Sequence, residues 1–169
     1  MSRPIVRYLL VIASAAFLQY TLVSQFRIAG VSADLFLVVA IAAGITAGAE
    51  RGAVVGFVSG LCLDLMVVTP FGLGAIAGLV AGLIAGLLEF ATVHSARWLT
   101  MVIAFLSSGT GVLVFALSGS LLGRPDMLSA RTFTVIAIVG LTSAVLVLPM
   151  IRVCRWADPD DLRLRAAVR

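Results

Sequence analysis

Residues 51–79 read RGAVVGFVSGLCLDLMVVTPFGLGAIAGL, an apolar stretch in which glycine recurs at a fixed interval. Outward from this stretch, glycines stand at 44, 48, 52, 56 and 60, and again at 74, 78, 82 and 86. Residues four apart lie along one face of an α-helix, and small residues there let two helix backbones approach closely. The spacing predicts that helices over 33–49, 52–68 and 73–90 pack tightly together. The same face also suits contact with another membrane protein, so both uses stay open.

Asp64 continues the glycine face, four residues beyond Gly60. A carboxylate deep in a bilayer costs at least about 2.5 kcal/mol unless it is paired, hydrated or near an interface. Two interpretations therefore stay open. Asp64 is either a functional group buried between helices, or a carboxylate near the outer end of its helix that caps the turn at residues 69–72.

Three further charged residues stand at the predicted helix ends. Asp34 opens the segment 33–49, where a carboxylate caps free backbone N–H groups and interacts favourably with the helix dipole. Glu50 and Arg51 fall between the second and third predicted helices, and we expect them to form a tight turn on the cytoplasmic side.

The composition of the whole chain is that of a membrane protein. Of its 169 residues, 62% are hydrophobic and 12% charged, with a mean hydropathy of +1.17, whereas soluble domains are about half apolar and a quarter charged. We predict an all-α integral membrane protein, a single bundle of about six transmembrane helices. The predicted spans are 6–26, 33–49, 52–68, 73–90, 98–121 and 132–153, followed by a short cytoplasmic tail at 154–169. The second and third are short against the roughly 20 residues that a bilayer requires.

The arginines predict which way the chain crosses the membrane. If the N-terminus is cytoplasmic, nine arginines fall on the inner face and three, Arg27, Arg124 and Arg131, on the outer loops. Cytoplasmic loops of membrane proteins carry an excess of basic residues. We therefore expect both termini of this multi-pass membrane protein to be cytoplasmic.

Residue patterns typical of catalysis are missing. The chain has one histidine, His94, and contains no P-loop, HExxH, CxxC or GxSxG motif. We predict a non-enzymatic protein without cofactor or metal, and without nucleic-acid binding because no basic patch stands beside exposed aromatic residues. Asp64 is nearly alone as an intramembrane ionisable group, which argues against an autonomous proton-coupled transporter. Binding of a neutral or apolar ligand stays open.

The order of motifs in residues 51–79 resembles the rod shape-determining protein MreD family. The resemblance rests on about fifty residues: an Asp opening the second span (Asp34), an Arg-Gly turn (Arg51-Gly52), and Gly-Leu-x-x-Asp (Gly60, Leu61, Asp64) followed by Pro70 and Gly72. The first span, and the chain beyond about residue 90, are generic apolar helix.

The resemblance implies a non-enzymatic subunit of the bacterial cell-elongation complex in the cytoplasmic (inner) membrane, which supports cell shape and lateral peptidoglycan synthesis. Its implied partners are an MreC-type single-span protein, RodA, a penicillin-binding transpeptidase and the lipid bilayer. The family is also similar in fold to the substrate-binding subunits of energy-coupling-factor transporters. The expected structural and partner-interface residues are Asp34, Arg51, Gly52, Gly56, Gly60, Asp64, Pro70 and Gly72. The alternative is a small-molecule-binding subunit of such a transporter, with a pocket near residues 69–74.

Overall fold

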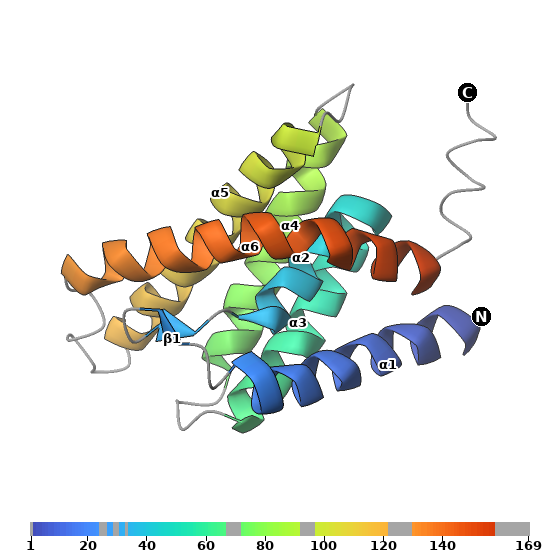
Figure 1. Ribbon diagram of the computed structural model, residues 1–169, viewed down its shortest axis with the longest axis horizontal. Helices are drawn as coiled ribbons and strands as arrows, with labels where there is room; N and C mark the ends of the chain where they lie inside the picture. Colours follow the sequence, from blue (N-terminus) through green and yellow to red (C-terminus); the bar gives the residue numbers. More distant parts are fainter. Residues whose placement is uncertain are drawn as a thin grey trace.

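The computed structural model describes residues 2–23, 27–28, 31–32, 34–66, 72–91, 97–121 and 130–157. Its α-helices are α1 (Ser2–Leu18), α2 (Leu35–Ala47), α3 (Ala49–Met66), α4 (Leu73–Ala91), α5 (Arg97–Leu121) and α6 (Ala130–Ala157) (Figure 1). A π-helical turn, η1 (Gln19–Val23), extends α1. A two-stranded ladder pairs β1 (Arg27–Ile28) with β2 (Val31–Ser32) in antiparallel register. Within the described residues, the prediction of a helical chain with six helices is confirmed, and the π-helical turn and the short ladder add to it.

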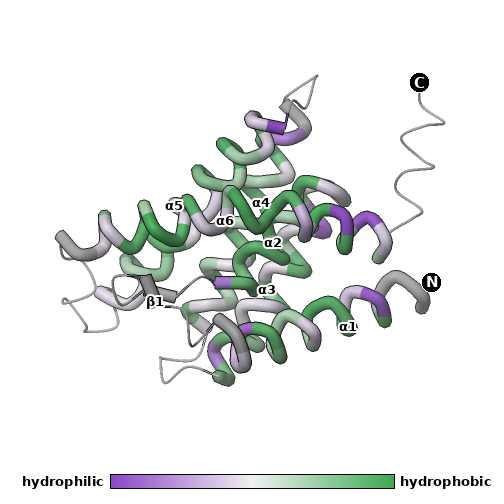
Figure 2. Tube along the Cα trace, in the orientation of Figure 1, coloured by the Kyte–Doolittle hydropathy of each residue, from purple (hydrophilic) through white to green (hydrophobic). Residues whose placement is uncertain are grey.

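Two of these helices are long and apolar enough to cross a membrane. They correspond to α5 and, within α6, to Thr132–Ala157. Shorter apolar segments lie at Val6–Thr21 in α1 and η1, at Leu35–Ala47 in α2 and at Leu73–Glu89 in α4. Hydrophobic residues run along the lengths of the helices, whereas hydrophilic residues gather near their ends (Figure 2).

The helix α2 lies at the centre of the molecule and contacts each of the other helices (Figure 1). Every residue from Leu35 to Ile45 is buried. With 13 residues, α2 is roughly 20 Å long at 1.5 Å per residue. Its apolar character on all sides is that of a helix enclosed by other helices.

The connection between α2 and α3 differs from the prediction. Gly48 alone joins the two helices, with φ 88° and ψ 172°, and its N–H donates to the carbonyl oxygen of Gly44 at 2.9 Å. Glu50 and Arg51 do not form the turn, because both lie in the first turn of α3. The expectation that they form it is wrong, because a glycine with positive φ reverses the chain within one residue and lets α3 begin at Ala49.

The helices α5 and α6 pack against each other in antiparallel fashion. The ring of Phe105 on α5 occupies the space that a side chain at Gly140 on α6 would need, and Ile136 lies beside Gly109. At the far end of α6, Arg7 of α1 donates from Nη1 to the carbonyl oxygen of Trp156 at 3.2 Å. The start of α1 and the end of α6 therefore lie side by side, as Figure 1 also shows.

Candidate functional site: the glycine interface and the Asp64 cap

Glycines bring the backbones of α3 and α4 into direct contact at three levels. A Cβ atom at Gly56 would overlap the carbonyl oxygen of Gly78, and one at Gly78 would overlap that of Gly56. The same reciprocal relation joins Gly52 to Gly82, and a Cβ at Gly60 would overlap the carbonyl oxygen of Gly74. The contacting glycines of the three-helix core, called the glycine interface below, are Gly44, Gly52, Gly56, Gly60, Gly74, Gly78, Gly82 and Gly86.

The central helix α2 joins the glycine interface at its C-terminal end. A Cβ at Gly44 would overlap the carbonyl oxygen of Gly82 and would lie 3.0 Å from the backbone nitrogen of Gly86. A Cβ at Gly52 would lie 2.5 Å from the Cα atom of Gly44. Three backbones thus converge at one level, which confirms the predicted tight packing of the second, third and fourth helices. The first glycine run does not follow a single helix, since Gly44 and Gly52 lie on different helices joined at Gly48.

Asp64 lies at the end of this interface that is farthest from Gly48, and it is only 4% exposed. Its Oδ1 accepts a hydrogen bond from the N–H of Gly74 at 2.9 Å. Its Oδ2 accepts from the N–H of Gly72 at 2.9 Å and from that of Ala75 at 3.2 Å. Gly74 and Ala75 lie in the first turn of α4, whose N–H groups have no partner inside the helix, and Gly72 directly precedes that turn. Asp64 on α3 therefore caps the N-terminus of α4.

This geometry agrees with part of each interpretation of Asp64, because the carboxylate is buried between helices and also caps a helix start. Of its three N–H donors, only Gly72 belongs to the predicted turn 69–72. Both carboxylate oxygens are occupied by backbone donors, as the capping interpretation requires. A negative charge at a helix N-terminus is also favoured by the helix dipole. Gly72, with φ 103°, adopts a backbone conformation that glycine reaches without steric cost, and so presents its N–H to the carboxylate. Pro70 and the rest of 67–71 lie outside the described residues, as does most of the pocket expected near 69–74.

A second cap holds the N-terminus of α2. Asp34 Oδ1 accepts from the N–H groups of Phe36 at 3.0 Å and Leu37 at 3.1 Å, which confirms the predicted capping role. Gln19 of η1 completes the cap, because its Oε1 accepts from the N–H of Leu35 at 3.0 Å. Sequence reasoning missed Gln19, since a side chain that caps a helix in another segment leaves no local pattern.

The two caps stand at the same end of the three-helix core. The helices α2 and α4 run parallel, since Gly44 lies beside Gly82 and Gly86, and α3 runs antiparallel to both. Arg51, exposed in the first turn of α3, lies 13 residues before Asp64, roughly 20 Å away along the helix. The expected site residues Asp64 and Arg51 therefore do not meet, and only the glycines and Asp64 form one continuous site.

Comparison of the chain with models of protein families, with curated proteins and with solved structures finds no match. Within the described parts of the chain, no group of three or more His, Cys, Asp or Glu side chains is placed to hold a metal ion. The described arrangement is one of close helix packing and helix capping.

Proposed function

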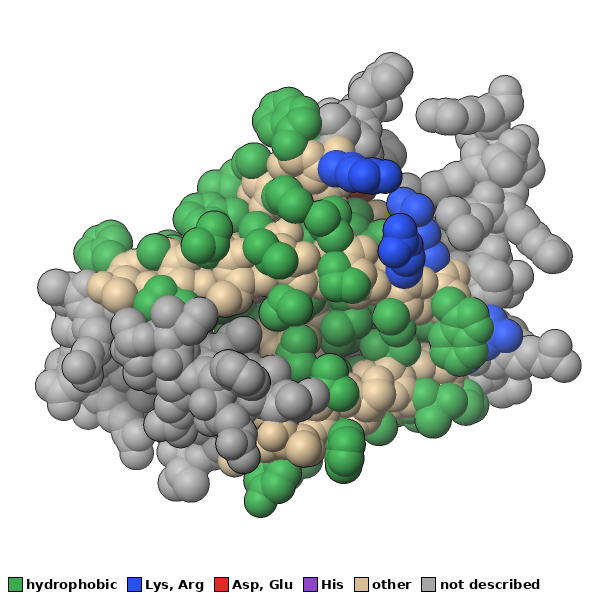
Figure 3. All heavy atoms as spheres, in the orientation of Figure 1, with side chains coloured by type: hydrophobic (Ala, Val, Ile, Leu, Met, Phe, Trp, Pro, Cys, Tyr) green, Lys and Arg blue, Asp and Glu red, His purple; other side chains and the backbone are tan. Residues whose placement is uncertain are grey.

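We propose that this chain is a multi-pass protein of the bacterial cytoplasmic membrane. This proposal is supported by the many large apolar side chains that are exposed on the surface of the molecule. Examples are Phe17 at 70% exposed, Leu65 at 73%, Phe133 at 76% and Leu141 at 66%, on α1, α3 and α6. Soluble monomers rarely expose contiguous apolar patches of more than a few hundred Å². Side chains of this kind cover much of the surface in Figure 3, and a lipid environment accounts for them.

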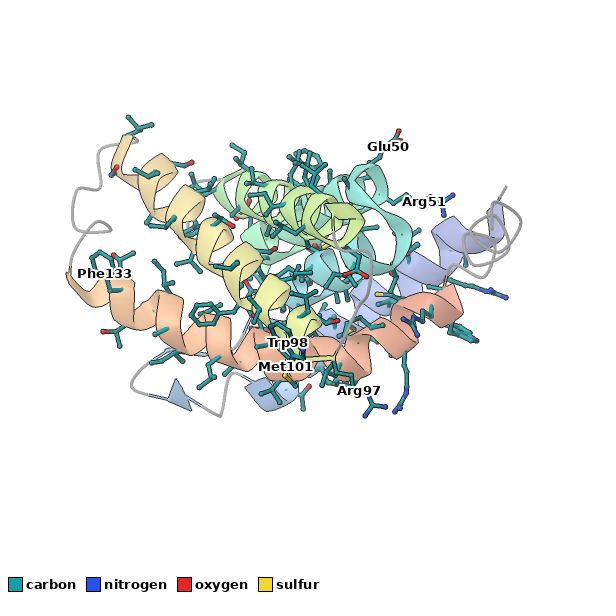
Figure 4. The ribbon with its side chains drawn as sticks, turned by 90° about the horizontal axis from the view of Figure 1, so that it is seen from above. Glu50, Arg51, Arg97, Trp98, Met101 and Phe133 are labelled. Carbon is teal, nitrogen blue, oxygen red and sulfur yellow. The ribbon has the colours of Figure 1, made fainter. Side chains whose placement is uncertain are left out.

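The distribution of arginine supports a placement with both termini cytoplasmic. The arginine side chains that the structure describes are Arg7, Arg51, Arg97, Arg152 and Arg155. They stand at the starts of α1, α3 and α5 and at the end of α6, which the antiparallel packing brings to one end of the molecule. Phe133 lies at the other end, far from Glu50 and Arg51 (Figure 4). Under the positive-inside rule, the arginine-bearing end faces the cytoplasm.

Within that membrane, we propose a role as a non-enzymatic subunit of the cell-elongation complex. The observation that supports this proposal is that part of the pattern resembling the MreD family, namely Gly60, Asp64 and Gly72, meets in one structural unit. Gly60 contacts the backbone of Gly74, Asp64 caps α4, and Gly72 supplies a positive φ at that cap. A sequence pattern whose members meet in one structural unit is better explained as the signature of a fold than as separate chance matches.

In this role the three-helix core is a rigid support, and the peripheral helices meet the partners. A single-span, MreC-type protein suits the exposed apolar faces of α1, α5 and α6, because a transmembrane helix packs by apolar contact. RodA and a penicillin-binding transpeptidase are the further proposed partners. The contribution of this chain is to hold these proteins together during lateral peptidoglycan synthesis.

The test is co-purification of the tagged protein from its own membranes in nanodiscs, followed by mass spectrometry. We expect recovery of an MreC-type protein with wall-synthesis enzymes, and reduced recovery for Asp64→Ala. Glu50→Gln, which alters an exposed carboxylate, is the matched control and should retain the partners. Recovery of an ATPase pair with a coupling subunit, or of a stoichiometric small molecule, would instead identify the chain as a transporter subunit.

A further inference from the structure

A group of three arginines and one tryptophan forms where the start of α1 meets the end of α6. Arg7 donates to the carbonyl oxygen of Trp156, and its guanidinium carbon lies 5.2 Å from the centroid of the Trp156 ring. Arg152 and Arg155 stand four residues and one residue before Trp156, on the last turns of α6. Arg7, Arg152, Arg155 and Trp156 are called the basic cluster below.

Two of the three guanidinium groups in the basic cluster are available to a ligand. Arg152 and Arg155 are exposed, and within the part of the chain that the structure describes neither has a hydrogen-bond or ion-pair partner. Arg7 already satisfies a carbonyl at the C-terminal end of α6, where unpaired carbonyls carry partial negative charge. Among the described residues, no acidic side chain therefore pairs with the positive charge of Arg152 or Arg155.

No acidic side chain belongs to either helix. The sequences of α1 and α6 contain no Asp or Glu. The segment 158–169 that follows α6 contains three Asp and three Arg, so its side chains bring no net charge. The basic cluster thus favours an anion, and its arginines suit a phosphate, which guanidinium groups bind through paired hydrogen bonds.

Exposed apolar side chains continue from the basic cluster along both helices. On α1, Val6 is 53% exposed and Leu10 58%; on α6, Val153 is 41% exposed and Val145 60%. Trp156 is 59% exposed, and tryptophan prefers the interface between head groups and acyl chains. In Figure 3, basic side chains at this end lie next to hydrophobic ones. A ligand that meets both surfaces is amphiphilic, with an anionic head.

We propose that the basic cluster binds the phosphate head group of an anionic phospholipid, whose acyl chains lie along the exposed faces of α1 and α6. This inference rests on the membrane placement proposed above, but not on the role in cell elongation. The lipid links the first and last helices at the cytoplasmic surface, in addition to the contact between Arg7 and Trp156.

Native mass spectrometry of the purified full chain in detergent tests this assignment, with phosphatidylglycerol and phosphatidylcholine added in equal amounts. We expect preferential retention of phosphatidylglycerol by the wild type. Arg152→Gln and Arg155→Gln should each lower that retention about fivefold, the change that corresponds to about 1 kcal/mol for one basic residue at an anionic surface. Arg7 is left intact because it also holds α1 against α6.

The matched control is Arg51→Gln, which removes an exposed arginine at the same end of the molecule but on α3. It should keep the wild-type preference. Equal retention of the two lipids, or an equal loss in Arg51→Gln, would overturn the assignment. Retention of free inorganic phosphate as strong as that of the lipid would also overturn it, because the apolar faces would then contribute nothing. Circular dichroism of each variant checks that its helices are intact, and none of these outcomes depends on partners in the cell.

Discussion

The Oδ1 atom of Asp64 on α3 accepts a hydrogen bond of 2.9 Å from the N–H of Gly74 on α4, and a Cβ atom at Gly74 would lie 2.5 Å from that same oxygen. The hydrogen bond therefore requires glycine at position 74, because a side chain there would occupy the place of the carboxylate oxygen. The carboxylate reaches the first turn of α4 only because Gly60 and Gly74 let the two backbones touch.

Replacement of Asp64 should lower the free energy of unfolding, and the loss should grow with the number of hydrogen-bond acceptor atoms that are removed. Asp64→Ala leaves three N–H groups at the start of α4, those of Gly72, Gly74 and Ala75, without their acceptor. We expect the free energy of unfolding to fall by about 3 kcal/mol. Asp64→Asn keeps the shape and one acceptor oxygen, so about half that loss is expected. Reversible unfolding in mixed micelles, followed by circular dichroism, measures both. If Asp64→Ala left the midpoint of the unfolding transition unchanged, the cap would not stabilise the packing of α3 and α4.

Substitutions in the glycine interface should be limited by steric overlap. In Gly56→Ala the new methyl group overlaps the carbonyl oxygen of Gly78, and we expect a destabilisation of at least about 2 kcal/mol, as for an overpacked core. Gly109→Ala is the matched control, because its Cβ meets only a methyl group of Ile136 at 3.4 Å. The free energy of unfolding of that variant should lie within about 0.5 kcal/mol of the wild-type value, since a small shift of Ile136 accommodates the methyl group. Equal effects of the two substitutions would contradict the described packing.

Gly48 should be intolerant for a different reason, its backbone conformation. No atom lies within 4 Å of the position that its Cβ would take, yet its φ of 88° and ψ of 172° belong to a region that is essentially restricted to glycine. We expect Gly48→Ala to lower the free energy of unfolding by about 1–3 kcal/mol. Gly48→Asn should be no better, because asparagine tolerates the left-handed helical region and not this one. Recovery of wild-type stability by asparagine in the same unfolding assay would contradict the assigned conformation.

The orientation of the chain can be tested with single cysteines. Cys62 and Cys154 are first replaced by alanine, and cysteine is then introduced at Glu50 or at Leu121, which is 88% exposed. Because these positions lie at opposite ends of the helix bundle, a membrane-impermeant maleimide added to spheroplasts should label Leu121→Cys only. Glu50→Cys should react after lysis. The reverse pattern would place the arginine-bearing end outside the cell.

The caps and the packing of the glycine-bearing helices could be predicted from the sequence, whereas individual side-chain contacts between distant segments could not. The cap at Asp34 depends on N–H groups two and three residues away, and the glycine spacing is itself a helical pattern. Gln19 and Leu35 are 16 residues apart, and Arg7 and Trp156 are 149 apart, so no periodicity connects them. The turn at Gly48 could not be predicted, because Gly44, Gly48 and Gly52 are evenly spaced and this spacing is typical of one helix face.

Under the membrane placement proposed above, the enclosure of α2 has a consequence for how the chain is inserted during synthesis. At roughly 20 Å, a helix of 13 residues falls short of a hydrocarbon core of about 30 Å, and its buried surface is complete only after α3 and α4 have formed. A nascent chain ending at Met66 lacks α4, which supplies the backbone groups that meet Gly56 and Gly60. Integration of α2 and α3 is therefore a joint event that waits for α4. Nascent chains stopped after Ala91 should protect α2 and α3 from protease, whereas in chains stopped after Met66, which α1 still anchors, these two helices should be digested.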